Sequence, residues 1–237
     1  MPVVEFAQAE VAIQGKTIIH PLNLRFSEHR VGIIGANGSG KSTVARLING
    51  LNIATAGRVT VDGVNLATHA KDVRKKVGFI FSDADSQIIM PTVAEDVAFS
   101  LRKHKLNKAE KARKVHEALQ LVGLVGHEDQ SPHMLSGGEK QLLALASISV
   151  LNPDLIVADE PTTLLDLGNR RRVEKLFTEL PQQMIIVSHD LDLLRHADRI
   201  ICMQDGRVVD DSGSPAGTHP DFSSTPVAVI ERYVSQF

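Results

Sequence analysis

The chain has 237 residues, of which 43% are hydrophobic and 23% are charged, a composition typical of a globular protein with a sizeable core. The formal net charge of −2 argues against a nucleic-acid partner held by bulk electrostatics, and the single cysteine, Cys202, excludes a disulfide framework. No apolar run approaches the ~18–20 residues that span a bilayer, and residues 1–8 resemble neither a signal nor a transit peptide, so we expect a cytoplasmic chain that reaches a membrane only through a partner.

The first third of the chain predicts strands. Residues 1–34 are typical of strands separated by turns, and apolar and polar residues alternate at 22–26 as in a half-buried antiparallel sheet. Residues 57–63 predict a short strand closed by an Asp-Gly turn, and the apolar run 77–81 has the length of a buried strand.

Strand-like runs alternate with helical segments in the last third of the chain. The apolar runs lie at 155–158, 184–187 and 199–203, and helical patterns lie at 167–180 and 191–197. This alternation predicts right-handed crossovers and a largely parallel sheet.

The middle of the chain, residues 82–151, has a helical pattern instead. Helix starts are indicated at Thr92 and Asn107, each followed three residues later by a glutamate. We therefore expect one domain over residues 1–237, with a core formed by 1–81 and 152–237 and a helical subdomain between them.

The stretch GANGSGKST, residues 35–43, carries the strongest functional signal. It follows the apolar run 31–34 and precedes a helical pattern, a context that favours a P-loop, G-x-x-x-x-G-K-[ST], over an ordinary glycine-rich turn. Glycines let consecutive backbone N–H groups turn toward one anion, and the helix start adds further free N–H groups. We expect Lys41 to reach the β- and γ-phosphates of a nucleotide and the Ser42 hydroxyl to hold Mg²⁺. The expected nucleotide-binding residues are Gly35, Asn37, Gly38, Ser39, Gly40, Lys41, Ser42 and Thr43.

Two adjacent acids, Asp159 and Glu160, follow the apolar run 155–158. Ligands gather at the carboxyl edge of a parallel sheet, so we expect Asp159 to bind Mg²⁺ directly or through water. Glu160 is expected to orient or deprotonate the attacking water. Without the P-loop, the same pair would indicate only the end of a strand.

The stretch LSGGEKQ, residues 135–141, combines a helix start with bare backbone. Ser136 and Glu139 have the spacing of a capping box, so the simplest interpretation is structural. The two glycines behind the cap each cost ~1 kcal/mol in a helix relative to Ala. Bare backbone at a helix start suits close approach to an anion, which would explain why this cost is tolerated.

Two single residues remain ambiguous from spacing alone. His189 follows the run 184–187, where its side chain could reach a γ-phosphate, although a lone histidine is more often structural. Asp166 is either a helix cap or a subunit contact.

Five motifs of the chain occur in the order typical of ATP-binding-cassette (ABC) ATPases, and this resemblance covers nearly the whole chain. The motifs are GANGSGKST, LSGGEKQ, LIVADEP, TLLD and VSHD. It implies an α/β P-loop NTPase fold with a mainly parallel core sheet, an N-terminal antiparallel β subdomain and an α-helical signature subdomain. It also implies binding of ATP and Mg²⁺. The implied assembly is a head-to-tail dimer, in which the P-loop of one subunit and the LSGGEKQ helix of the other enclose each ATP.

The resemblance also implies roles for single residues. Glu160 resembles the catalytic carboxylate, His189 the switch histidine and Asp166 the D-loop residue at the dimer contact. The signature residues that would face the nucleotide bound by the other subunit are Ser136, Gly137, Gly138 and Gln141.

The segment FSDADSQIIMPTVAEDVAFSL, residues 81–101, is similar to the FQNPDxQ…PTVxEDVAFG segment of energy-coupling-factor (ECF) importers. ECF importers take up vitamins and transition-metal ions with ATPases, a coupling membrane protein and a substrate-binding membrane protein. Overall likeness favours the biotin system, and the resemblance implies a peripheral protein on the cytoplasmic face of the cell membrane.

Two positions depart from the family pattern. Ser82 stands where the family has its Q-loop glutamine, so either Ser82 acts through a water, which we favour, or Gln87 replaces the missing side chain. Gln87 could instead only pack against the membrane partner. Ile13 stands where an aromatic residue usually stacks on adenine, which predicts weak discrimination between ATP and GTP.

The expected function is ATP hydrolysis that energises an ECF-type vitamin importer, favouring biotin, by a homodimer or a pair with a paralogous ATPase. One alternative is the ATPase of a cobalt or nickel ECF importer or of another ABC transporter. A non-transport ABC ATPase acting on DNA or ribosomes is a further alternative. It fits less well, because such proteins carry coiled-coil inserts or fused cassettes and this chain is not basic.

Overall fold

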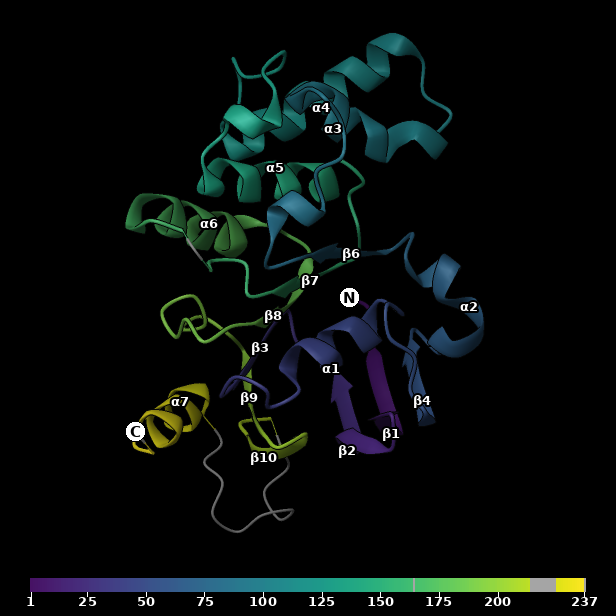
Figure 1. Ribbon diagram of the computed structural model, residues 1–237, viewed down its shortest axis with the longest axis vertical. Helices are drawn as coiled ribbons and strands as arrows, with labels where there is room; N and C mark the ends of the chain where they lie inside the picture. The colour runs from purple at the N-terminus through teal and green to yellow at the C-terminus, as the bar shows by residue number, and fades with distance from the viewer. Residues whose placement is uncertain (164, 214–224, 237) are drawn as a thin grey trace. The chain divides into compact units, whose positions relative to one another are not determined.

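The computed structural model describes residues 1–163, 165–213 and 225–236, and the chain forms two compact units (Figure 1). The first unit comprises Met1–Val77, Asp154–Glu160 and Pro181–Phe237. The second unit comprises Gly78–Pro153 and Pro161–Leu180. Each unit has its own buried apolar residues.

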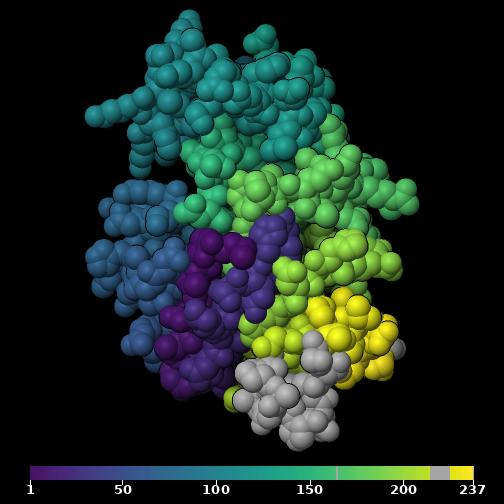
Figure 2. Space-filling view, turned by 180° about the vertical axis from the view of Figure 1, so that it is seen from behind, coloured from purple at the N-terminus to yellow at the C-terminus, as the bar shows by residue number. Residues whose placement is uncertain are grey.

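The N-terminal part of the first unit is an antiparallel sheet with the strand order β2-β1-β4-β5. Alternate apolar residues of β1, such as Val4 and Phe6, are buried, while the polar residues between them are exposed. Atoms of the first strands, in purple, accordingly reach the molecular surface (Figure 2). The expected antiparallel β subdomain is confirmed. Its strands are β1 (Val4–Ile13), β2 (Lys16–Phe26), β4 (Ala56–Val61) and β5 (Val64–Asn65).

A mainly parallel sheet forms the rest of the first unit, with the order β10-β9-β3-β8-β7. Strand β3 pairs in parallel with β8 and β9, β7 pairs in parallel with β8, and β10 is an antiparallel edge. Strands β3, β7 and β8 are buried along their whole length, as the apolar runs predict. The strands are β3 (Arg30–Gly35), β7 (Leu155–Asp159), β8 (Gln183–Val187), β9 (Arg199–Gln204) and β10 (Arg207–Asp211).

Tight turns and three helices make up the other described parts of the first unit. The expected Asp-Gly turn at Asp62-Gly63 has positive φ at both residues, as a type I′ hairpin requires, and so does a second turn at Asp205-Gly206. The helix expected at 191–197 is wrong, because this segment forms successive turns with hydrogen bonds between residues three apart. The helices are α1 (Lys41–Ile48), α2 (Leu66–Val73) and α7 (Pro226–Val234). Strand β6 (Val77–Ile80) leads from the first unit into the second.

The second unit is helical, and the two expected helix starts are confirmed. Thr92 caps one helix, and Asn107 forms a complete capping box with Glu110 at the start of the next. Short 3₁₀ segments (Ala84–Ser86, Leu101–Lys103 and Pro132–Met134) connect the longer helices. The α-helices are α3 (Val93–Ser100), α4 (Lys108–Val122), α5 (Gly137–Ser149) and α6 (Leu167–Glu179).

One segment lies in a different unit from the one expected. Residues 161–180, expected in the core, belong to the second unit together with α3, α4 and α5. Arg172 on α6 donates to the carbonyl of Gly123 at 3.0 Å, which ties α6 to the end of α4. The assignment of functional subdomains to these parts stays a prediction.

Candidate functional site

The P-loop connects the carboxyl end of β3 to the start of α1. Gly35 has φ of 146° and Gly40 has φ of 97°, conformations that side chains rarely adopt. A Cβ atom on Gly35 would lie 2.2 Å from the backbone oxygen of Met203, so only glycine fits there. Helix α1 begins at Lys41 with no side-chain cap, which leaves its first N–H groups for an external anion.

Lys41 and Ser39 place a buried ammonium and a buried hydroxyl in the P-loop. The Lys41 ammonium is buried, donates to the carbonyls of Gly35 at 2.7 Å and Ala36 at 3.0 Å, and has a pKa lowered by desolvation, which the nearby Glu160 partly opposes. The Ser39 hydroxyl is buried and has no hydrogen-bond partner in the described part of the chain. A cation and an unsatisfied donor in this loop suit a phosphate group.

Ser42 and Asp159 bring two oxygen atoms together beside the P-loop. The Ser42 hydroxyl donates to Asp159 Oδ1 at 2.7 Å, and the Arg46 guanidinium lies 3.8 Å from Oδ2. Asp159 is only 2% exposed, and desolvation raises the pKa of its carboxyl although the Ser42 hydrogen bond opposes this. Hydroxyl and carboxylate oxygens fit Mg²⁺, which binds one or two protein oxygens together with phosphate and water. Arg46 gave no signal in the sequence, because only the α1 turn places it near Asp159.

Glu160 and His189 meet at the same sheet edge. Strands β7 and β8 are parallel neighbours with Asp159 opposite Val187, so the residues that follow them come together. His189 Nδ1 lies 2.7 Å from Glu160 Oε2. Glu160 has φ of 53° and its N–H donates to Val187, so its backbone is held in a left-handed conformation that is uncommon for a non-glycine residue. The arrangement presents a largely buried carboxylate and an exposed imidazole as one pair.

In the second unit, the signature stretch begins α5 as a complete capping box. Ser136 Oγ and Glu139 Oε2 lie 2.8 Å apart, and hydrogen bonds from Ser136 lower the pKa of the Glu139 carboxyl. A Cβ atom on Gly137 would meet nothing within 4 Å, whereas one on Gly138 would lie 2.3 Å from Asn169. Packing within the chain therefore requires glycine at 138 but not at 137.

The side chains of Gln87 and Gln141 in this unit both hydrogen-bond to backbone near Phe81. Gln141 is 4% exposed, and its Nε2 donates to the Phe81 carbonyl at 3.0 Å. Gln87 accepts from the Phe81 N–H and donates to the Phe79 carbonyl, both at 3.3 Å. Ser82 is exposed.

The remaining predicted residues lie at element ends. Asp166 is the N-cap of α6 and accepts from the Asn169 N–H at 2.9 Å, which matches the helix-cap alternative; Leu164 of the same motif lies outside the described residues. Ile13 is 55% exposed at the end of β1, beside the hairpin turn. The roles of these residues stay predictions.

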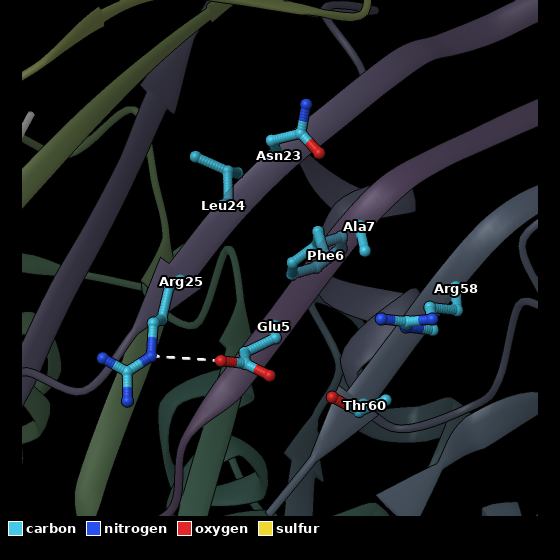
Figure 3. A pocket seen from close by; sticks show the side chains of 8 residues that line it. All are labelled: Glu5, Phe6, Ala7, Asn23, Leu24, Arg25, Arg58 and Thr60. Carbon is cyan, nitrogen blue, oxygen red and sulfur yellow. Dashed lines mark hydrogen bonds and ion pairs between the residues drawn. The ribbon is translucent and has the colours of Figure 1, made fainter. Parts of the chain in front are cut away.

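A groove that the sequence analysis did not identify lies on the antiparallel sheet (Figure 3). Its volume is about 430 Å³, and it is crossed by the ion pair between Arg25 and Glu5 at 3.1 Å. The register of three strands brings its residues together, so no local sequence pattern marks it. None of its residues belongs to the P-loop. They are Glu5, Phe6, Ala7, Asn23, Leu24, Arg25, Arg58 and Thr60.

The fold and the first unit's residues define a P-loop nucleotide-binding protein. The P-loop site combines an uncapped helix start behind a glycine loop with a buried lysine. It also contains a serine–aspartate pair at the carboxyl edge of the parallel sheet. The model of the ABC transporter family matches residues 19–163, and the chain belongs to this family. It is accordingly an ATP-binding and ATP-hydrolysing subunit, and the resemblance seen in the sequence is confirmed.

Related proteins match nearly the whole chain. A Bartonella quintana protein named as an ABC transporter ATP-binding protein is 44% identical over 99% of this chain and 98% of its own length. The biotin transport ATP-binding protein BioM of Rhizobium etli is 42% identical over 88% of this chain and 92% of its own length. The energy-coupling factor transporter ATP-binding protein EcfA1 of Caldanaerobacter subterraneus is 40% identical over 90% of this chain and 79% of its own length.

A solved structure has the same fold. The structure of cbiO1 from Clostridium perfringens, described as part of the ABC transporter complex cbiONQ, has a TM-score of 0.81 and 28% identity over 98% of this chain and 92% of its own. Within the described residues, no helix combines the length and apolar character needed to cross a bilayer.

Proposed function

We propose that this chain is the ATPase subunit of an ECF-type importer that takes up a vitamin, with biotin as the substrate. The chain would lie on the cytoplasmic face of the membrane, bound to a coupling membrane protein that works with a separate substrate-binding membrane protein. The names of the BioM and EcfA1 relatives support the importer class. The alternative substrate class is cobalt or nickel ions.

The pairing of Glu160 with His189 beside the P-loop is the observation that carries the catalytic part of the proposal. Lys41 and the N–H groups of α1 would bind the phosphates, while Ser42 and Asp159 would hold Mg²⁺, which would neutralise phosphate charge. Glu160 orients the attacking water and accepts its proton. His189 holds Glu160 Oε2 and thereby fixes the direction of the carboxylate.

We propose that two ATPase subunits act head to tail, as a homodimer or as a pair with a paralogue. The start of α5 would meet the nucleotide on the other subunit, and the open space around Gly137 supports this because nothing within its own unit occupies it. Asp166, already the cap of α6, would lie at the dimer contact. One ATP would then need residues from both subunits.

The contact with the coupling membrane protein is assigned to the segment 81–101. Ile89 in this segment is 61% exposed, and a protein contact would cover it. The segment therefore has a side chain suited to dock on a membrane protein, and we propose that it transmits dimer closure to that protein.

The test is co-expression of the chain with its candidate coupling membrane protein, followed by purification and measurement of ATP hydrolysis. We expect a stable membrane complex that hydrolyses ATP, with hydrolysis lost in Glu160→Gln. Glu179→Gln, an exposed carboxylate on α6, serves as the matched control and should keep the wild-type rate. A chain that hydrolyses ATP equally well with and without the membrane protein, and does not bind it, would contradict the importer assignment.

Uptake of labelled substrate separates the two substrate classes. Cells that express the complete importer should accumulate biotin in a manner that requires Glu160. Accumulation of cobalt or nickel ions instead would replace biotin by the alternative class, while the ATPase assignment would stand.

A further inference from the structure

One short stretch of the second unit concentrates positive charge. Residues 102–114 contain seven lysines and arginines and one acidic residue, a formal charge of +6, although the whole chain carries −2. The stretch runs from the end of the 3₁₀ segment Leu101–Lys103 into the first half of α4, and atoms of this part of the chain, in blue-green, lie on the molecular surface (Figure 2). Its charge is thus opposite in sign to that of the rest of the chain.

The two arginines of this stretch already have partners. The Arg102 guanidinium lies 3.9 Å from the centre of the Phe99 ring and donates to the Phe99 carbonyl at 3.1 Å. Arg113 forms an ion pair with Glu117 at 2.6 Å. The five lysines, in contrast, make no side-chain hydrogen bond or ion pair in the described part of the chain. They form the lysine patch, which consists of Lys103, Lys105, Lys108, Lys111 and Lys114.

The lysine patch does not stabilise its own helix. Lys108 and Lys111 lie near the start of α4, where the free N–H groups already carry partial positive charge. Lys108, Lys111 and Lys114 are spaced three residues apart, so like charges are neighbours on one side of the helix. Glu110 in the first turn offsets only part of this repulsion. Because the charge is unfavourable within the chain, we infer that it serves an external anion.

The chemistry of lysine indicates what kind of anion this is. Lysine is a flexible point charge, whereas recognition of a single carboxylate or phosphate group favours the planar fork of arginine. Lys103, Lys105 and Lys108 are exposed, so their ammonium groups are free to follow a diffuse layer of charge. A surface of anionic phospholipid headgroups attracts clustered lysines in this way.

The position of the lysine patch in the second unit supports the same partner. The patch directly follows the segment 81–101, which we assign to the contact with the coupling membrane protein. Within the second unit α3, which belongs to that segment, packs against α4. The contact of Arg102 with Phe99 also joins the end of α3 to the start of the patch. A subunit docked through this segment would therefore hold the patch on the side that faces the membrane.

We propose that the lysine patch binds the anionic lipid headgroups that surround the coupling membrane protein. Each lysine held near an anionic membrane strengthens binding about fivefold, so the patch adds affinity that is independent of the protein contact. The inference rests on the proposed location at the membrane and is independent of the transported substrate. It predicts that the chain binds anionic lipid even when no membrane protein is present.

The test is co-sedimentation of the purified chain with phosphatidylcholine vesicles prepared with and without phosphatidylglycerol. At about 0.1 M salt, where charges more than about 10 Å apart are screened, we expect binding only to the vesicles that contain phosphatidylglycerol. The combined variant Lys103→Gln, Lys105→Gln and Lys108→Gln should lower the partition coefficient by about 10²-fold, since three lysines are lost. Salt at about 1 M should release the wild-type chain.

A matched control separates the lysine patch from net charge. Lys16, Lys71 and Lys175 are exposed lysines elsewhere in the chain, and changing all three to glutamine alters the net charge equally. This control variant should bind the anionic vesicles within about twofold of wild type, because charges outside the contact are screened. The patch variant should keep the wild-type melting temperature and rate of ATP hydrolysis, since its three lysines have no partners to lose in the described part of the chain.

Several results would overturn the proposal. Failure to bind phosphatidylglycerol vesicles, or equal binding to both kinds of vesicle, would exclude the electrostatic contact with lipid. Equal losses in the patch and control variants would mean that only net charge matters. Weaker capture of the patch variant by the coupling protein in uncharged lipid, without any binding to bare vesicles, would assign the patch to a protein contact instead. A chain that binds anionic vesicles through the patch but never binds the coupling protein would support the lipid contact and contradict the importer assignment.

Discussion

His189 Nδ1 lies 2.7 Å from Glu160 Oε2, and the backbone nitrogen of His189 lies 3.3 Å from the same oxygen. An ionised carboxylate can only accept hydrogen bonds, so this contact suits the histidine tautomer that carries its proton on Nδ1. The exposed fractions of the two side chains are 63% for His189 and 15% for Glu160. The His189 side chain is thus exposed to solvent, whereas the Glu160 carboxylate that it holds is largely buried.

His189→Ala should lower kcat for ATP hydrolysis by about 10²-fold, because Glu160 would lose the side chain that holds its carboxylate. A positioned acid–base group such as Glu160 contributes about 10²–10⁴-fold. KM should change little, since the P-loop binds the phosphates. The combination with Glu160→Gln should be no slower than Glu160→Gln alone, because groups that act as a unit are not additive. Steady-state kinetics measure kcat and KM for these variants. The control is His196→Ala, which removes another exposed histidine of the first unit. A multiplicative loss in the double variant would mean that His189 does not act through Glu160.

Gly35→Ala should destabilise the nucleotide-free chain far more than Gly38→Ala. A Cβ atom at 35 would lie 2.2 Å from the backbone oxygen of Met203, whereas one at 38 would meet nothing within 4 Å. We expect Gly38→Ala to cost about 1–2 kcal/mol in the free energy of unfolding, from its left-handed backbone alone. Gly35→Ala should cost about 2 kcal/mol more, because overpacking is added. Urea denaturation measures both, and equal costs would contradict the close approach of β3 to β9.

Ile13→Tyr should strengthen ATP binding and sharpen the discrimination against GTP. An exposed isoleucine offers the base an apolar surface without an aromatic face, and an aromatic pair adds about 0.5–1.5 kcal/mol. The affinity of the variant for ATP should therefore rise about three- to tenfold. Competition between labelled ATP and GTP checks this, with Ile53→Tyr, at another exposed isoleucine of the first unit, as control. Strong ATP selectivity in the wild-type chain would contradict the proposed adenine surface.

Cys202 should resist alkylation in the folded chain. Desolvation, with the charge of Asp210 as a second cause, raises the pKa of its thiol from 9.0 to about 11. The reactive thiolate is therefore scarce at pH 8, and iodoacetamide should label the folded chain slowly and the urea-unfolded chain rapidly. Labelling of the folded chain at the rate of a free thiol would contradict this burial.

The same shift in pKa has a consequence for stability. Because the thiol ionises at lower pH in the unfolded chain, the folded state binds more protons between pH 9 and about 11. The contribution of the Cys202 thiol to the free energy of unfolding is therefore fully present below pH 9 and is lost as pH rises to about 11. Cys202→Ala should remove this part of the decline. Urea titrations at several pH values measure it, and an identical decline in the variant would contradict it.

The sequence by itself determined the elements whose signals are local. The sequence predicted the P-loop between a buried strand and a helix, and it predicted helix starts at Thr92, Asn107 and Ser136. These predictions were possible because each signal depends on residues only a few positions apart. The long apolar runs became fully buried strands for the same reason. The segment 191–197 shows the limit of such signals, since its apolar spacing fits a helix and the chain forms turns.

Only the tertiary structure decided which distant residues meet. Parallel pairing of β7 with β8 brings Glu160 to His189, and pairing of β3 into the same sheet brings Ser42 to Asp159. The inward direction of Gln141 depends in the same way on contacts that α5 makes with a segment far along the chain. Local propensity depends on neighbours in sequence, whereas side-chain pairing depends on strand register and helix packing, which the whole chain sets together.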